Sequence, residues 1–250
     1  MINSIFNEYG RFYDLLYSDK NYAGEVAYVL DLLDRFGLKK GHLLEFGSGT
    51  GKHGRLLATH GYTVHGIERS AAMVSQADLA TSGFSCAQGD ICDLTLGRKF
   101  DAVLALFHVI SYQVTNGQLL AVFKNAAAHL NHKGLFIFDF WYTPAVHSLK
   151  PSIRVKRIAD DEVEITRIAE PSIRENENRV DIHYTIYARN KKNDSIQIFH
   201  ETHAMRHFTL PEIDLLAQMS GFLRINAEEF LSKAAPGLTT WGVSVTLQRC

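Results

Sequence analysis

Two spacings of apolar residues alternate along the first 140 positions of the chain. Val26, Val29, Leu30 and Leu33 recur at the spacing of a helix face, and Gly37 follows where a helix C-cap would stand. Further along, short apolar runs predict strands at residues 42–46, 63–67, 84–88, 102–106 and 135–140, and helical patterns between them predict helices at 55–60, 71–79 and 118–130. Strands that alternate with helices in this way predict a parallel sheet.

The pattern changes near residue 153 to the alternation of apolar and polar positions that is typical of antiparallel strands. The alternating runs are 163–165, 180–187 and 196–199, and polar turns at 175–178 and 190–195 separate them. We expect these strands to be inserted over one edge of the parallel sheet. Beyond them, Thr209 to Glu212 has the spacing of a capping box, which predicts a helix through Met219 that ends at Gly221. Two final strands are predicted at 222–227 and 242–248.

These elements together predict an α/β fold: a Rossmann-like, seven-stranded, mainly parallel sheet with helices on both faces and an inserted antiparallel β segment. With 250 residues, of which 46% are hydrophobic, the chain is long enough to bury one substantial core. We therefore expect a single domain over residues 1–250, with a β-rich insertion at about 151–208 that shapes the pocket for an acceptor molecule.

Charge and cysteine content narrow the partners and the compartment. Lysine and arginine total 26 against 27 acidic residues, so the chain has no overall positive field, and neither nucleic acid nor a membrane is an expected partner. Cys86, Cys92 and Cys250 show no C-x-x-C spacing, which favours a reducing cytoplasm. No apolar run approaches the ~20 residues needed to span a bilayer, and the N-terminus lacks an export signal. The sequence therefore predicts a cytoplasmic protein with a small-molecule substrate.

A glycine-rich turn follows the first predicted strand and leads into a helix. Gly47, Gly49 and Gly51 allow a tight turn and let main-chain N–H groups approach a ligand closely. Gly49, Gly51 and Gly54 also satisfy the G-x-G-x-x-G spacing of nicotinamide and flavin enzymes. The loop alone does not separate these cofactor classes.

Three acidic residues at the ends of consecutive strands distinguish the possible cofactor classes better than the glycine loop does. Glu68 ends the second strand, where its carboxylate can accept from both hydroxyls of an adenosine ribose. Glu45 adds negative charge beside the loop, which would repel a pyrophosphate but suits a cationic methionyl group. Asp90 follows the third strand, where it can accept from an adenine amine while Ile91 packs on the ring. This set favours a sulfonium cofactor over a dinucleotide.

The acids and glycines together resemble the class I methyltransferases that depend on S-adenosylmethionine. The resemblance runs from about Tyr9 to the end of the chain and implies that S-adenosylmethionine is the cofactor. Residues 13–25, 97–101, 107–112 and 140–144 are also similar to small-molecule N-methyltransferases that act on amino groups of nucleotide-linked sugars. Tyr22, Arg69 and Phe107 are also expected to bind the cofactor. The resemblance departs at Tyr112, where those enzymes carry a histidine.

Candidate catalytic residues follow from these positions. In methyl transfer from a sulfonium the leaving group is already good, so aligning the acceptor is the main requirement. Tyr17 could close over the cofactor as part of an aromatic lid, and His108 follows the fourth strand at the ligand-binding edge of the sheet. Tyr112 can hydrogen-bond and orient an acceptor, but a phenol with a pKa near ~10 is a poor resting base. A structural, hydrogen-bonded role for His108 stays open.

The remaining candidates concern the acceptor and a metal. Trp141 leaves the fifth strand at the same edge, where a flat ring suits a sugar or a base. Arg154 and Lys156 share one face of a predicted strand and could meet a diphosphate. His200, His203 and His207 have a spacing that would suit a metal on a helix, but on a strand His200 faces away from the other two, so no metal is expected.

The sequence therefore predicts an SN2 methyl transfer to a small-molecule amine, such as an amino sugar on a nucleotide carrier. An O-methyltransferase is the alternative within the class. An NAD-dependent oxidoreductase and a non-catalytic protein that binds S-adenosylmethionine are alternatives from other classes. The oligomeric state is not predicted.

Overall fold

The computed structural model describes residues 8–250 and contains a twisted sheet in which strands from the two halves of the chain meet. The strands are β1 (His42–Phe46), β2 (Thr63–Glu68), β3 (Phe84–Gln88), β4 (Phe100–Ala105), β5 (Leu130–Tyr142), β6 (Arg154–Ala159), β7 (Val163–Arg174), β8 (Arg179–Asn190), β9 (Ile196–Phe208), β10 (Phe222–Glu229) and β11 (Gly242–Arg249). Strands β3, β2, β1, β4 and β5 lie side by side in that order and are parallel, whereas β11 pairs antiparallel with β5 and β10 antiparallel with β11. The predicted α/β architecture is confirmed.

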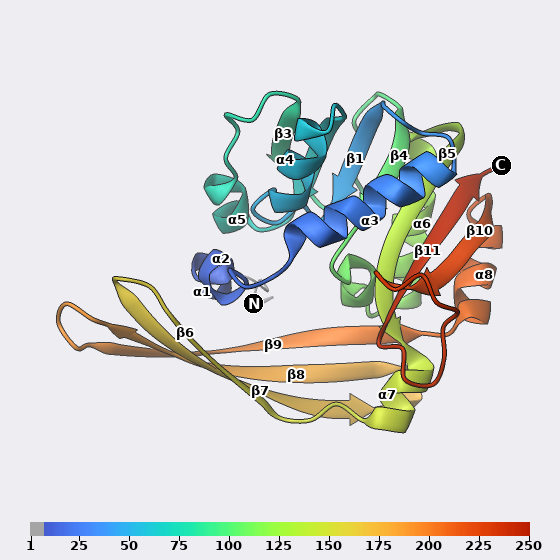
Figure 1. The fold of residues 1–250 in the computed structure, drawn as a ribbon. Coiled ribbons are helices and arrows are strands. Elements are labelled where there is room, and N and C mark those ends of the chain that lie inside the picture. The colour runs from blue at the N-terminus through green and yellow to red at the C-terminus, as the bar shows by residue number, and fades with distance from the viewer. Residues whose placement is uncertain (1–7) are drawn as a thin grey trace.

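Helices cover both faces of this sheet (Figure 1). They are α1 (Glu8–Arg11), α2 (Tyr13–Leu16), α3 (Tyr22–Arg35), α4 (Lys52–Thr59), α5 (Ala71–Gln76), α6 (Asn116–His129), α7 (Thr143–Leu149) and α8 (Leu210–Met219), with the 3-10 turns η1 (Val109–Tyr112) and η2 (Glu175–Glu177). The apolar faces of α3 and α4 pack on one side of the sheet, and those of α6 and α8 pack on the other. The amphipathic patterns read from the sequence therefore face the core.

The sheet is larger than the predicted seven strands, because the insertion joins it. Strands β6 to β9 form an antiparallel unit, and β9 pairs with the end of β5 through Trp141 with His207 and Tyr142 with Phe208. The pairing of β4 with β5 ends at Phe138, so the last residues of β5 have an open edge on that side. The connected sheet has eleven strands in the described part of the chain.

The inserted strands lie below the carboxyl ends of the parallel strands, and the short helices α1 and α2 lie between the two layers (Figure 1). Tyr9 and Leu16 of these helices are fully buried against Ile165 and Ile186 of the insertion. The chain therefore folds its N-terminal segment into the space between the α/β core and the inserted sheet.

One local prediction is wrong. Helix α8 begins after Thr209 as expected, but the Thr209 side chain makes no capping hydrogen bond. Glu212, the expected partner in the capping box, pairs instead with Arg206 at 2.5 Å. A capping box does form at α6, where Thr115 and Gln118 bond reciprocally.

Candidate active site

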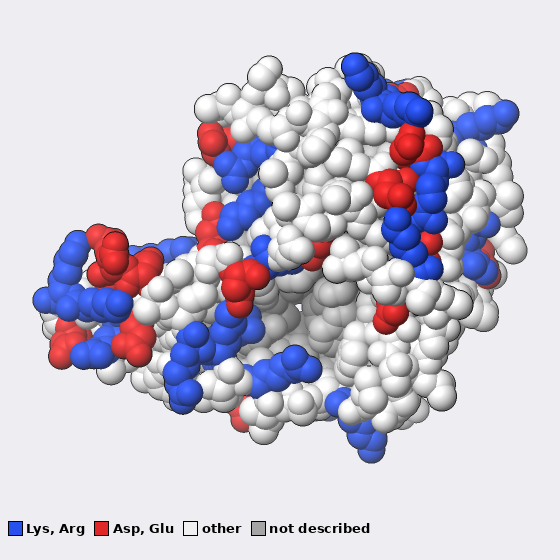
Figure 2. All heavy atoms as spheres, in the orientation of Figure 1, with Lys and Arg blue, Asp and Glu red and all other residues white. Residues whose placement is uncertain are grey.

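A cavity of about 800 Å³ lies between the ends of the parallel strands and the inserted sheet. Figure 2 shows the hollow from outside, with lysine and arginine side chains beside it. One wall consists of the glycine loop and the ends of β2 and β3, and the opposite wall carries side chains of β5 and the insertion. Open α/β folds bind ligands at this edge of the sheet.

The glycine loop needs glycine at two of its turns. Gly47 has a φ of +65° and Gly51 a φ of +78°. A Cβ on Gly47 would lie 2.5 Å from a Val109 methyl group, and one on Gly51 would lie 2.5 Å from the Phe84 ring. Gly49 has a φ of +58° and lines the cavity, and the nearest atom to a Cβ built there is Met73 Sδ at 4.0 Å, so its main chain can be reached by a ligand in the cavity. The loop is a main-chain cradle.

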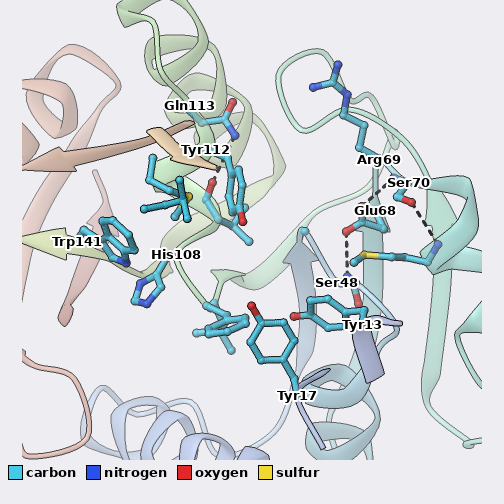
Figure 3. A pocket seen from close by; sticks show the side chains of 18 of the residues that line it. Tyr13, Tyr17, Ser48, Glu68, Arg69, Ser70, His108, Tyr112, Gln113 and Trp141 are labelled. Carbon is cyan, nitrogen blue, oxygen red and sulfur yellow. Dashed lines mark hydrogen bonds between the residues drawn. The ribbon is translucent and has the colours of Figure 1, made fainter. Parts of the chain in front are cut away.

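Glu68 holds this cradle in place from the end of β2. Its carboxylate accepts from the Gly49 N–H at 3.0 Å and from the Ser70 N–H at 2.8 Å (Figure 3). Burial raises the pKa of Glu68 above its usual range, although these main-chain bonds oppose the shift. Glu68 lines the cavity, where each carboxylate oxygen retains acceptor capacity for a ligand hydroxyl.

The end of β3 supplies Asp90 and Ile91. Both line the cavity, and Asp90 accepts from the Cys92 N–H at 2.9 Å. Arg69 also lines the cavity, with its Nε 3.9 Å from Asp90 Oδ2. The structure thus brings these three predicted residues to the same wall as Glu68.

Two residues predicted to bind the cofactor, Glu45 at the end of β1 and Gly51 of the glycine loop, do not line the cavity. Glu45 is 2% exposed and accepts from the Ser48 hydroxyl at 2.6 Å. Burial raises the pKa of the Glu45 carboxyl. From this position Glu45 stabilises the conformation of the loop through Ser48, and its side chain does not reach the cavity.

The aromatic lid comes from α2 and the turn after it. The Tyr17 ring packs edge-on against Phe107 at 5.2 Å between centroids, and both rings line the cavity. The Tyr17 hydroxyl lies 3.0 Å from that of Tyr9, and Arg167 of β7 donates to Tyr9 at 2.6 Å. Tyr22 also lines the cavity, near the loop. The lid is therefore fastened to the inserted sheet.

Asp14 of α2 fastens the other side of the lid. Thr50 of the glycine loop donates its hydroxyl to Asp14 at 2.8 Å, and the Lys52 ammonium lies 3.2 Å from the same oxygen. The lid is thus attached both to the insertion and to the cofactor wall.

His108 lies at the centre of the cavity wall, between β4 and η1, with Trp141 beside it (Figure 3). His108 Nδ1 is 2.6 Å from Asp139 Oδ2, and the His108 N–H donates to the same oxygen at 3.1 Å. Burial raises the pKa of Asp139, but the charge and hydrogen bonds of His108 outweigh it and leave the pKa lowered. Phe107 and His108 have φ angles of +64° and +63°, a strained pair of the kind found at functional sites.

Tyr112 of η1 also lines the cavity. Its hydroxyl lies 3.1 Å from His203 Nδ1, and His203 Nε2 lies 3.1 Å from Glu201 Oε2. Burial raises the pKa of Tyr112 well above its usual range. The three residues belong to η1 and β9, which are far apart in the sequence.

Of the two basic residues predicted to meet a diphosphate, Arg154 and Lys156, one lies at the cavity and the other does not. Arg154 lines the cavity, together with Lys150 and Arg167. Lys156 does not line it, because its ammonium pairs with Asp19 beside the lid at 2.6 Å. On the side of the cavity formed by the insertion, the cations that line it are therefore Lys150, Arg154 and Arg167.

The three histidines of β9 lie as their strand positions predict. His200 is exposed and within hydrogen-bonding distance of the Thr185 hydroxyl, whereas His203 and His207 are buried. His207 Nδ1 lies 2.8 Å from the Thr143 hydroxyl. Among residues 8–250 no three metal-ligating side chains gather at one place.

Sequence reasoning did not assign Asp139, Arg167 or His203 to this site, and it considered His203 only as a metal ligand. Asp139 is a single carboxylate in the otherwise apolar run of β5, and that interruption is a signal that could have revealed it. Arg167 and His203 gave no comparable signal, because their partners are 158 and 91 residues away in the chain. Only the pairing of the inserted strands brings them to the cavity.

Comparison with known proteins agrees with this geometry. Residues 43–134 match the model of a methyltransferase domain family. The chain is 29% identical over 205 residues to a dTDP-3-amino-3,6-dideoxy-alpha-D-glucopyranose N,N-dimethyltransferase of Streptomyces fradiae, covering 81% of this chain and 78% of the relative. It is 27% identical over 212 residues to a dTDP-3-amino-3,4,6-trideoxy-alpha-D-glucopyranose N,N-dimethyltransferase of Streptomyces venezuelae, covering 84% and 87%.

Comparison with solved structures supports the fold as well. The crystal structure of an S-adenosylmethionine-dependent methyltransferase from Clostridium acetobutylicum superposes with a TM-score of 0.81 at 19% identity, over 98% of this chain and 99% of that one. The chain is an S-adenosylmethionine-dependent methyltransferase, as the sequence predicted. The oxidoreductase alternative is wrong, since the matched domain is a methyltransferase domain. None of the helices that the structure describes has the length and apolar character needed to cross a bilayer.

Proposed function

We propose that this enzyme transfers a methyl group to the amine of an amino sugar that is joined to a nucleotide. The observation that carries the proposal is the second wall of the cavity, where aromatic rings and cations of β5 and the insertion face the cofactor wall. The two Streptomyces relatives are named as N,N-dimethyltransferases of dTDP-linked amino sugars, which supports the same class of acceptor.

The acceptor wall has the chemistry that such a molecule needs. Trp141 and Tyr184 offer flat rings on which a sugar or a base can stack. Arg154 and Lys150, both exposed at the cavity, offer cations for a diphosphate. The volume of about 800 Å³ lies in the upper part of the range of ~300–1,000 Å³ for small-molecule sites.

The residues of the cofactor wall fit S-adenosylmethionine, because the glycine cradle is open in front of Gly49 and Glu68 faces the same space. We assign the ribose hydroxyls to Glu68, the adenine amine to Asp90 and the adenine ring to Ile91. When bound, the cofactor supplies a methyl group on a sulfonium that is already a good leaving group. Alignment of the acceptor is then the main contribution of the protein.

Further residues complete the cofactor pocket and the lid. Gly47 and Gly49 present main-chain groups to the methionyl portion, and the Tyr17 and Phe107 rings cover the region between the two walls. Tyr22 and Arg69 extend this enclosure on either side. An aromatic enclosure of this kind stabilises a cation and excludes water.

His108 and Tyr112 are assigned to the acceptor amine. An amine attacks only in its neutral form, so a proton has to leave it. Asp139 fixes the orientation of the His108 ring through the 2.6 Å contact, which is how a carboxylate orients a catalytic imidazole. Tyr112 of η1 lines the same cavity and is assigned a contact with the acceptor amine.

A matched pair of acceptors and variants tests the proposal. We expect release of S-adenosylhomocysteine with nucleotide-linked amino sugars, and a KM for them that rises severalfold in Arg154→Ala. The KM for the free amino sugar stays unchanged in the same variant, since it lacks the diphosphate. Arg157→Ala is the control, because Arg157 is exposed on the same strand and does not line the cavity. Turnover of hydroxylated acceptors alone would overturn the proposal in favour of O-methylation.

The same proposal places the enzyme in the cytoplasm. Cys86, Cys92 and Cys250 are all free thiols, which fits a reducing compartment. The acceptor is a small molecule, and the near-zero net charge of −1 supports no role for nucleic acid.

A further inference from the structure

Tyr112, His203 and Glu201 form a continuous hydrogen-bonded chain that starts in the cavity and ends inside the inserted sheet. The Tyr112 hydroxyl is 3.1 Å from His203 Nδ1, and His203 Nε2 is 3.1 Å from Glu201 Oε2. Glu201 Oε1 also accepts from the Tyr9 N–H at 2.9 Å, which fixes the carboxylate. His203 is 2% exposed, so the imidazole communicates with the cavity through Tyr112.

The partners determine which nitrogen of His203 carries the proton. A glutamate carboxylate only accepts hydrogen bonds, so His203 Nε2 must be the donor in that contact. In the neutral imidazole the other nitrogen, Nδ1, is then an acceptor. Tyr112 therefore donates its hydroxyl hydrogen to His203 Nδ1. This is the order of groups in which a carboxylate orients an imidazole toward a hydroxyl.

Tyr112 cannot serve as a base by resting as a phenolate. Burial raises the pKa of its hydroxyl well above the usual range, and the nearby Tyr184 and Tyr17 hydroxyls raise it further. A phenol can still take one proton if it gives up another at the same moment. His203 is placed to receive that second proton.

We propose that Tyr112 and His203 form a proton relay that takes the proton from the protonated acceptor amine. The N–H bond of the ammonium breaks and its electron pair stays on nitrogen as the attacking lone pair. The proton bonds to Tyr112 Oη, and the hydroxyl proton of Tyr112 moves to His203 Nδ1. The imidazolium so formed is balanced by the Glu201 carboxylate, and the relay reverses to solvent once the product has left. This inference rests on the proposed amine acceptor.

Other charged and titratable groups surround the relay from neighbouring elements. The Tyr9 ring of α1 and the Tyr184 ring of β8 pack on the His203 ring at 5.2 Å and 4.8 Å between centroids. Arg167 of β7 lies over the Tyr184 ring at 5.2 Å and bonds to the Tyr9 hydroxyl. Among these groups, Glu201 is the anion in direct contact with the imidazole.

The tautomer of His203 is tested first, on the whole enzyme without substrate. We expect the ¹⁵N NMR spectrum to place the single proton of neutral His203 on Nε2, with the resonance assigned by its loss in His203→Asn. The Nδ1 resonance should shift in Tyr112→Phe, which removes the donor. A proton on Nδ1, or no shift in Tyr112→Phe, would overturn the relay. This outcome does not depend on whether any amine is methylated.

Kinetics with two His203 variants then separate proton transfer from orientation. Asparagine can accept the hydrogen bond from Tyr112 but cannot hold its proton, whereas alanine can do neither. We expect His203→Asn and His203→Ala to lower kcat alike, by about 10²-fold at neutral pH. Both should recover to near wild type above the pKa of the acceptor ammonium, where the amine arrives neutral. The control His200→Ala, exposed on the other face of β9, should keep wild-type kcat.

An orientation role would give a different result: His203→Asn near wild type at neutral pH, or no recovery of either variant at high pH. Either would overturn the relay. Failure of the proposed function has its own signature, since the wild-type enzyme would then turn over no amine at any pH while the NMR result stands or falls by itself.

Discussion

The two walls of the cavity are built from different materials. The cofactor wall centres on main-chain groups of the glycine loop, with glycine at positive φ and the Glu68 carboxylate that accepts from two N–H groups. The ends of β2 and β3 add the side chains of Arg69, Asp90 and Ile91. The acceptor wall uses side chains, aromatic and basic, from β5, the turn before β6 and the strands β6, β7 and β8.

The difference explains what each wall can change. A main-chain cradle keeps its shape under most substitutions outside its glycines, so it suits a constant ligand. A wall of side chains on an inserted sheet can be altered residue by residue without disturbing the parallel core. The comparison predicts that damage to the first wall affects the cofactor, and damage to the second affects the acceptor alone.

The largest effect is expected from Glu68→Ala. It removes the acceptor of the Gly49 and Ser70 N–H groups as well as the proposed ribose contacts. Each hydrogen bond to a charged group contributes about 1.5–3 kcal/mol, so the Kd for S-adenosylhomocysteine should rise by about 100-fold or more. Titration calorimetry measures this, with the exposed Glu170→Ala as the control. An unchanged Kd would contradict the assignment.

Gly47→Ala should come next. The substitution combines a φ of +65° with a Cβ 2.5 Å from Val109, and we expect a loss of about 1–3 kcal/mol in the free energy of unfolding together with weaker cofactor binding. Gly37→Ala separates the two causes, because Gly37 has a φ of +84° with nothing within 4 Å of its Cβ. It should lose about 1 kcal/mol and keep its affinity. Denaturant unfolding of both variants measures the difference.

Trp141→Ala tests the acceptor wall. The ring lines the cavity beside His108, at 6.1 Å between centroids. Loss of a stacking contact worth ~1–1.5 kcal/mol should raise the acceptor KM about tenfold, while the Kd for S-adenosylhomocysteine stays at the wild-type value. Equal losses in both would mean that the walls are not independent.

The effect that is smallest at neutral pH concerns the joint where β9 meets β5. Burial lowers the pKa of His207 from 6.5 to about 4, helped by the neighbouring His147 and Arg206. Between these pH values His207 is protonated in the unfolded chain but neutral in the native state. The free energy of unfolding should therefore fall as the pH drops from about 6.5 toward 4. One site gives a slope of up to about 1.4 kcal/mol per pH unit. Thermal unfolding of His207→Gln should be flatter over this range, and an equal slope would contradict the prediction.

The same contrast explains which features the sequence could predict. The strands β1 to β5 and the glycine loop follow from patterns that repeat within a few residues, as do the positions of Glu68 and Asp90 at strand ends. The attachment of β9 to β5 depends on a pairing of Trp141 with His207, 66 positions apart in the sequence, and no local pattern encodes that register.

Side-chain partnerships were predicted least well. Lys156 was expected at the cavity because it shares a strand face with Arg154, but its ammonium forms an ion pair with Asp19 beside the lid. The periodicity of a strand predicts which of its faces a side chain lies on. It does not predict which neighbouring residue that side chain pairs with. The alternation of side chains along β9 correctly predicted that His200 and His203 face opposite sides. The contact of His203 with Tyr112 of η1 could be found only in the folded chain.

The contact between His108 and Asp139 also has a practical consequence for engineering. Asp139 is 1% exposed, and a buried carboxylate that loses its partner costs about 3–5 kcal/mol. A library that randomises position 108 alone will therefore be depleted of folded protein before any new acceptor preference is seen. Screens should vary positions 108 and 139 together, with His108→Gln and Asp139→Asn as one starting combination, so that expression yield and turnover can be selected separately.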